Sequence, residues 1–173
     1  MNLSRRTFIA AGLVGAVALA TAGWLKGPHA PPSGTARRTL DADAEAILGA
    51  VVPVLLDGAL PETREARDHA IAQTLTAIDL AIAGLPLAAQ AELSQLFALL
   101  ALPPVRLGLA RVAAPWQHAS PAEVRLCLDR FRESSWALPR AAYEALHQLT
   151  FAAWYGNPQA WPTIGYGGPP QIG

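Results

Sequence analysis

The segment SPAEVRLCLDRFRE, residues 120–133, carries the clearest helix signature in the chain. It begins with serine at the N-cap position, proline in the first turn and glutamate at the third helical position, which is the pattern of a capping box. The charged side chains that follow alternate with apolar residues at helical spacing, and the apolar residues are Val124, Cys127, Leu128 and Phe131. The segment therefore predicts an amphipathic helix with one face directed into a core.

Apolar residues recur at the same spacing on both sides of this segment. The further stretches lie around residues 47–55, 71–82, 93–100 and 139–155. No stretch alternates with a period of two over a useful length, which argues against β-strands. The sequence therefore predicts an all-α fold, a small bundle of about five helices.

Prolines and glycines predict where these helices bend or end. We expect Pro53 to kink the first helix, Gly84 and Pro86 to close the second, and the Pro103-Pro104 pair to stop the third. The inward face of the last helix is expected to consist of Leu138, Ala142, Leu146, Leu149 and Ala153.

Composition and charge limit the class of protein. The chain has 173 residues, of which 52% are hydrophobic and 15% charged, and its thirteen basic residues balance thirteen acidic ones. Low charge with many apolar residues indicates a folded domain and not a disordered chain. The basic residues form no long run or helical stripe, so a nucleic-acid partner is not expected.

The N-terminus has the features of an export leader. Arg5 and Arg6 precede an apolar stretch, and Phe8 stands two positions after the second arginine, as in twin-arginine signals. Residues 20–22 read Ala-Thr-Ala, which is a suitable cleavage site. Residues 8–25 are 18 residues without a charge, the lower limit for a membrane span, so both cleavage and retention as an anchor stay open.

These features divide the chain into four parts. Residues 1–22 are expected to be the twin-arginine signal, residues 23–38 a linker rich in proline and glycine, and residues 39–155 the helical bundle. Residues 156–173 are expected to form an irregular tail, because residues 156–170 contain four prolines and four glycines. The aromatic residues of this tail suggest that it packs, either on the bundle or on another protein.

No residue pattern in the chain predicts catalysis. The four histidines are scattered, and Glu144 with His147 is expected to lie on a solvated helix face. The single cysteine, Cys127, is interpreted as a buried small side chain, with an intermolecular disulfide as the alternative. We therefore expect no catalytic residue, metal ligand or cofactor in this chain itself.

Three segments together resemble a known family. They are the twin-arginine leader, the stretch AEAILGAVVPVLLDGALPE at residues 44–62, and the tail FAAWYGNPQAWPTIGYGGPP at residues 151–170. With these, the chain resembles the gluconate 2-dehydrogenase subunit 3 family, the small subunits of membrane-bound, FAD-dependent sugar and polyol dehydrogenases. The specific marks are the helix ending near a proline, the Asp57-Gly58 turn and the aromatic tail.

The resemblance implies a role in a three-part periplasmic enzyme. In that family a large subunit binds FAD, and a cytochrome c subunit carrying haem c anchors the complex at the membrane. The small subunit carries the signal for the twin-arginine translocase and escorts the large subunit. By their position in the matching tail, the expected partner contacts are Tyr155, Asn157, Trp161 and Tyr166. The chain lacks the longer glycine-rich segment that many family members have after Asn-Pro, so the substrate does not follow from the resemblance.

Two other interpretations remain open from the sequence. The chain is either such an escort, or an independent periplasmic helical binding protein, or an enzyme whose site carries no recognisable motif. The tail distinguishes the first two, since an escort should expose Tyr155, Trp161 and Tyr166 when alone. A self-contained domain should bury the same side chains.

Overall fold

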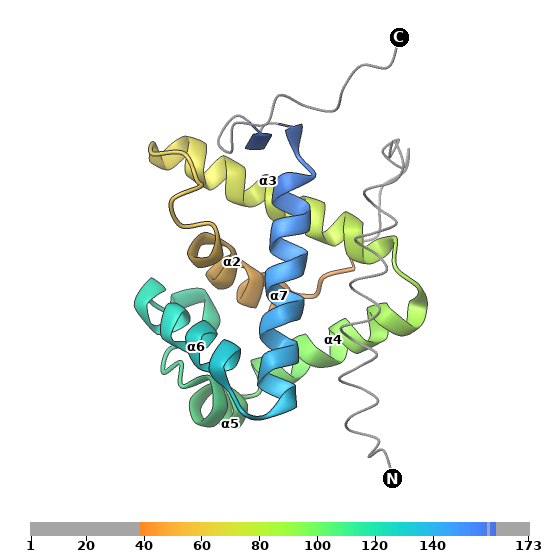
Figure 1. The fold of residues 1–173 in the computed structure, drawn as a ribbon, viewed down its shortest axis with the longest axis vertical. Helices are drawn as coiled ribbons and strands as arrows, with labels where there is room; N and C mark the ends of the chain where they lie inside the picture. Colours follow the sequence, from red (N-terminus) through yellow and green to blue (C-terminus); the bar gives the residue numbers. More distant parts are fainter. Residues whose placement is uncertain (1–38, 159, 162–173) are drawn as a thin grey trace.

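The computed structural model describes residues 39–158 and 160–161, and within them all regular structure is helical (Figure 1). This confirms the predicted all-α bundle. The elements, in order, are α2 (Ala42–Leu55), α3 (Arg64–Ala83), α4 (Leu87–Ala101), α5 (Pro103–Val105), η1 (Arg106–Ala110), η2 (Trp116–His118), α6 (Pro121–Glu133) and α7 (Ala137–Tyr155). The predicted signal and linker lie outside the described residues, and so do Arg5, Arg6, Phe8 and Tyr166.

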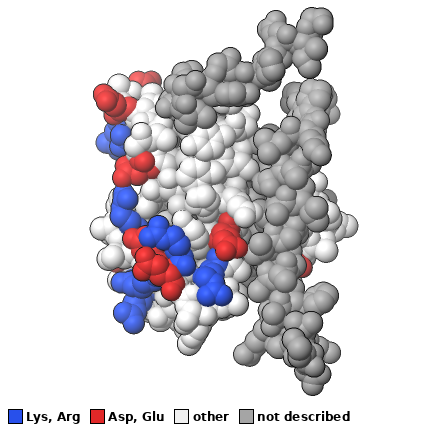
Figure 2. All heavy atoms as spheres, viewed as in Figure 1, with Lys and Arg blue, Asp and Glu red and all other residues white. Residues whose placement is uncertain are grey.

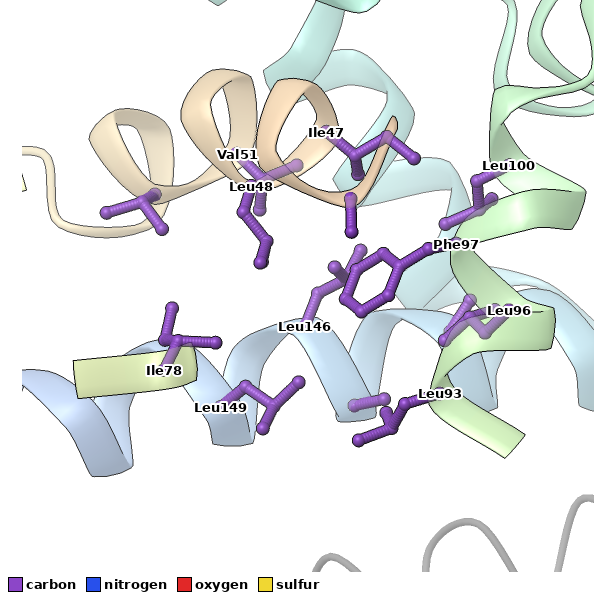
Figure 3. Packing of buried hydrophobic residues seen from close by; sticks show 14 of the residues in the cluster. Ile47, Leu48, Val51, Ile78, Leu93, Leu96, Phe97, Leu100, Leu146 and Leu149 are labelled. Atoms are coloured by element: carbon purple, nitrogen blue, oxygen red, sulfur yellow. The ribbon is translucent and has the colours of Figure 1, made fainter. Parts of the chain in front are cut away.

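Helix α2 is the centre of the bundle, and α3, α4, α6 and α7 all pack against it (Figure 1). Figure 3 shows the Phe97 ring pointing from α4 into the space between α2 and α7. Ile47 of α2 is fully buried. Phe97 of α4 and Leu146 of α7 are each 2% exposed. Each such side chain contributes about 1.5–3 kcal/mol through burial, so this junction is a main source of stability.

Helix α6 begins with the predicted capping box. The Ser120 side chain accepts a hydrogen bond from the Glu123 backbone N–H, and the Glu123 carboxylate accepts one from the Ser120 backbone N–H at 3.1 Å. The four predicted core residues of this helix are all buried. Local sequence signals therefore place both the start and the inward face of α6 correctly.

The end of α2 leads into a tight turn. Pro53 lies in the last turn of the helix, which continues to Leu55. Gly58 follows with φ +83°, in the left-handed region that glycine adopts at low cost. The Asp57-Gly58 turn therefore redirects the chain from α2 toward α3.

The segment between α4 and α6 differs from the expectation of a plain stop. Pro103 and Pro104 end α4 but also begin the short helix α5, which runs into the π-helical turn η1. The guanidinium of Arg106 donates to three successive backbone carbonyls, those of residues 112–114, and so holds the loop closed. The Trp116 indole N–H donates to the buried carbonyl of Leu100 at 3.0 Å, which fastens the loop to α4.

The prediction that Leu138 faces the core is wrong. Leu138 is 48% exposed, whereas Pro139 and Ala142 are buried. The reason is that α7 begins at Ala137, so that Pro139 and Ala142, three positions apart, occupy the inward side of the first two turns.

Among the described residues, no single helix is long and apolar enough to span a membrane. Helix α4 together with Pro103–Ala110 has the length and composition of a span, but the pair is bent by 71°. The apolar side of α4 forms part of the bundle core.

Candidate docking groove

Four aromatic rings follow one another along α7. They occupy every fourth position, so they share one side of the helix, and they are Tyr143, His147, Phe151 and Tyr155. Successive ring centroids lie 5.5, 4.3 and 5.7 Å apart. The first three rings are half-buried and Tyr155 is 36% exposed. This aromatic stripe therefore lies at the surface and not in the core.

A groove of about 230 Å³ runs beside the stripe. Three helices that are distant in sequence line it: the end of α2, one side of α6 and the stripe side of α7. Its lining residues are Val54, Leu55, Arg125, Leu128, Asp129, Arg132, Tyr143, His147 and Phe151. Val54 and Leu128 are buried and form an apolar floor, whereas the two arginines are exposed at the rim.

The charges of the groove lie on its α6 side. Arg125 is paired with Asp57 at 2.6 Å, and Arg132 is paired with Asp129 at 3.2 Å. Residues 145–161 contain no charged side chain, and Figure 2 shows an uncharged area over the upper half of α7. An apolar, aromatic area bordered by paired charges is the composition of a protein–protein contact surface.

His147 differs from its predicted setting. Its ring stacks on Phe151 and lines the groove, whereas Glu144 is exposed as expected for a solvated face. Burial lowers the pKa of His147, which favours the neutral imidazole at neutral pH. In this form the ring extends the apolar character of the stripe.

The first residues of the tail fold back on the bundle. The Trp161 indole N–H donates to the Tyr155 carbonyl at 2.8 Å, and Ala160 is 1% exposed. The Asn157 carbonyl accepts the Ala160 N–H at 2.9 Å, so this segment turns just after α7. Of the four predicted contact residues, the structure brings Tyr155 and Trp161 together and places Asn157 in the turn between them. Trp161 is half-buried and Ala160 is buried, so these two residues pack on their own chain.

Cys127 lies on the inward face of α6 and is 2% exposed. Burial raises the pKa of its thiol to about 12, and the nearby positive charge of Arg130 offsets this only in part. A thiol in this state forms little thiolate and reacts slowly. The position favours the interpretation of Cys127 as a core residue over a disulfide to a partner.

The groove connects two of the segments that carry the family resemblance. Val54 and Leu55, from residues 44–62, line it together with Phe151, the first residue of the segment 151–170. The Asp57-Gly58 turn is joined to the same groove through Arg125. The i,i+4 repeat of aromatic rings is visible in the sequence, whereas its position beside a groove follows only from the packing of α2, α6 and α7.

Within the described residues, no group of three or more His, Cys, Asp or Glu side chains lies close enough to hold a metal ion. Comparison of the chain with protein-family models, with curated proteins and with solved structures finds no match.

Proposed function

We propose that this chain is the non-catalytic small subunit of a periplasmic, membrane-bound, FAD-dependent sugar, polyol or alcohol dehydrogenase. It escorts the large flavoprotein subunit through the twin-arginine translocase and aids its maturation. FAD belongs to the large subunit and haem c to a cytochrome c subunit, and this chain carries neither. The proposal rests on the motifs of the sequence together with the groove.

The observation that carries the proposal is the aromatic stripe beside the groove. Half-exposed aromatic rings over an apolar floor supply large contact area at low entropic cost, which is typical of interface hot spots. The groove also brings together the residues of two motif segments that are otherwise unrelated in sequence. In this proposal the large subunit covers the groove, and Tyr155 lies at the edge of the contact.

An independent binding protein is the second candidate. It is favoured by the contact between Trp161 and Tyr155, because a tail that packs on its own bundle needs no partner to cover it. The two candidates differ in what travels with the chain during export.

The export signal gives the first test. Arg5 and Arg6 are both replaced by lysine in the source organism, and the periplasmic fraction is assayed for this chain and for FAD-dependent dehydrogenase activity. Loss of both together supports the escort. Loss of this chain alone, with dehydrogenase activity retained, favours the independent binding protein.

The groove gives the second test, by co-purification of the flavoprotein with the tagged chain. Phe151→Ser should reduce the recovered flavin at least about tenfold, because it removes an aromatic anchor at the centre of the stripe. Trp136→Ala is the matched control. Trp136 directly precedes α7, is 70% exposed and lines no part of the groove. Equal recovery with both variants would contradict docking at the groove.

A further inference from the structure

The exposed positions of helix α4 carry no charge, and the charged residue of this helix, Glu92, is half-buried. Counted through the residue after the helix, the exposed positions are Leu87, Ala88, Ala91, Ser94, Gln95, Ala98 and Leu102. Leu87 is 82% exposed and Leu102 is 48% exposed, so both ends of this α4 outer face are apolar. The solvent side of a helix usually carries charges, as the outward side of α6 does. The α4 outer face is therefore a surface suited to being covered.

The described chain begins directly beside this helix. The Asp79 carboxylate of α3 accepts the backbone N–H groups of Thr39 and Leu40 at 2.8 and 3.0 Å. The Leu40 side chain is 9% exposed, and it borders a small cavity with Gln90 and Leu93 of α4. This clamp fixes the point from which the N-terminal residues of the chain extend, next to the start of α4.

The N-terminal segment has the length and chemistry to cover the face. Residues 26–38 are thirteen residues and span up to about 45 Å when extended. The fifteen residues of α4 are about 22 Å long, so the connection reaches every part of it. Residues 8–25 carry no charge and include Gly12 and Gly15, and small residues allow helices to approach closely.

We propose that residues 8–25 dock on the α4 outer face while they remain attached to the bundle. Attachment raises their effective concentration into the millimolar range, which favours docking over contact with other chains. The docked segment is shielded from water until the translocase takes it. The proposal goes beyond the escort function, and it is independent of the groove because α4 contributes no groove residue.

Photo-crosslinking in the full-length chain tests the contact. A photoreactive amino acid replaces Ala91, and the same residue at Ala122, which is exposed on α6, serves as the control. We expect intrachain crosslinks from position 91 to residues 8–25 and none from position 122. Crosslinks from position 91 to a second copy, or the absence of any crosslink to residues 8–25, would overturn the proposal.

A charge on the face provides a second readout. In the A91E/A98E variant, hydrogen exchange in residues 8–25 should become about tenfold faster than in the unaltered chain. Ala122→Glu is the matched control and should leave that exchange unchanged. Ala98→Lys alone replaces the double variant if the latter fails to fold, and equal exchange in variant and unaltered chain would exclude docking at this face.

Discussion

Arg125 of α6 donates a hydrogen bond to the Asp57 carboxylate at 2.6 Å and so joins the turn after α2 to the rim of the groove. The two residues are 68 positions apart. Their side chains are 54% and 66% exposed, so solvent screens the pair and limits its contribution to stability. Its structural consequence is to hold the Asp57-Gly58 turn beside α6.

Arg125→Ala should therefore lower the free energy of unfolding by less than about 1 kcal/mol. Urea denaturation of the variant measures this, with Arg130→Ala as a control on the same helix. If Arg125→Ala instead lowered the free energy of unfolding by more than about 2 kcal/mol, and by clearly more than Arg130→Ala, the pair would be required to hold the turn in place.

Two glycines should respond to alanine with opposite signs. Gly58→Ala should destabilise the chain by about 1–2 kcal/mol, because an L-residue is strained at φ +83°. Gly49→Ala should stabilise it by about 0.5–1 kcal/mol, because Gly49 lies inside α2 and a Cβ there meets no atom within 4 Å. Thermal or urea unfolding of both variants tests the two signs: a stabilised Gly58→Ala would contradict the turn geometry, and a destabilised Gly49→Ala would contradict the open space around Gly49.

Loss of the capping serine should weaken the start of α6. Ser120→Ala should cost about 1 kcal/mol, because the Glu123 backbone N–H loses its side-chain acceptor. Ser135→Ala, an exposed position outside the helices, is the matched control and should change stability by less than about 0.5 kcal/mol. Equal midpoints in urea for the two variants would show that the cap contributes nothing.

Cys127 should be unreactive in the folded chain. With the pKa of its thiol at about 12 and only 2% exposure, modification by a soluble disulfide reagent requires opening of α6. Labelling at pH 8 should be at least about a hundredfold slower in the native chain than in urea. The intact mass of the purified complex without reductant should show separate subunits. A mass equal to the sum of two subunits would instead support a disulfide between Cys127 and a partner.

His147 should make stability depend on pH. Burial lowers its pKa in the folded state below the ordinary value of 6.5, so the unfolded chain binds the proton more readily. The stabilisation that the neutral ring contributes is complete above the pKa of His147 in the unfolded chain. It is lost as the pH falls through that value toward the lower pKa of the folded chain. The free energy of unfolding should fall from about pH 7.5 to about pH 5.5 more steeply in the unaltered chain than in His147→Gln. Parallel curves would show that the ring is fully hydrated.

Much of the fold follows from local sequence signals. The Ser120–Glu123 cap and the apolar spacing of α6 involve neighbours within one or two turns, so steric preference and local hydrogen bonding decide them. Gly84 ends α3 for a similar reason. Pro103-Pro104 shows the limit of such signals, because proline is compatible with the first turn of a new helix as well as with the end of an old one.

The candidate groove depended on the tertiary structure. The sequence by itself determined that α2 ends in a tight turn and that α7 carries a ring at every fourth position. Only packing decided that Val54 and Phe151 line one groove, that Leu138 faces solvent and that His147 is half-buried. The physical reason is that periodicity defines the faces of a helix, whereas the partner of each face is selected by burial of apolar area among segments distant along the chain.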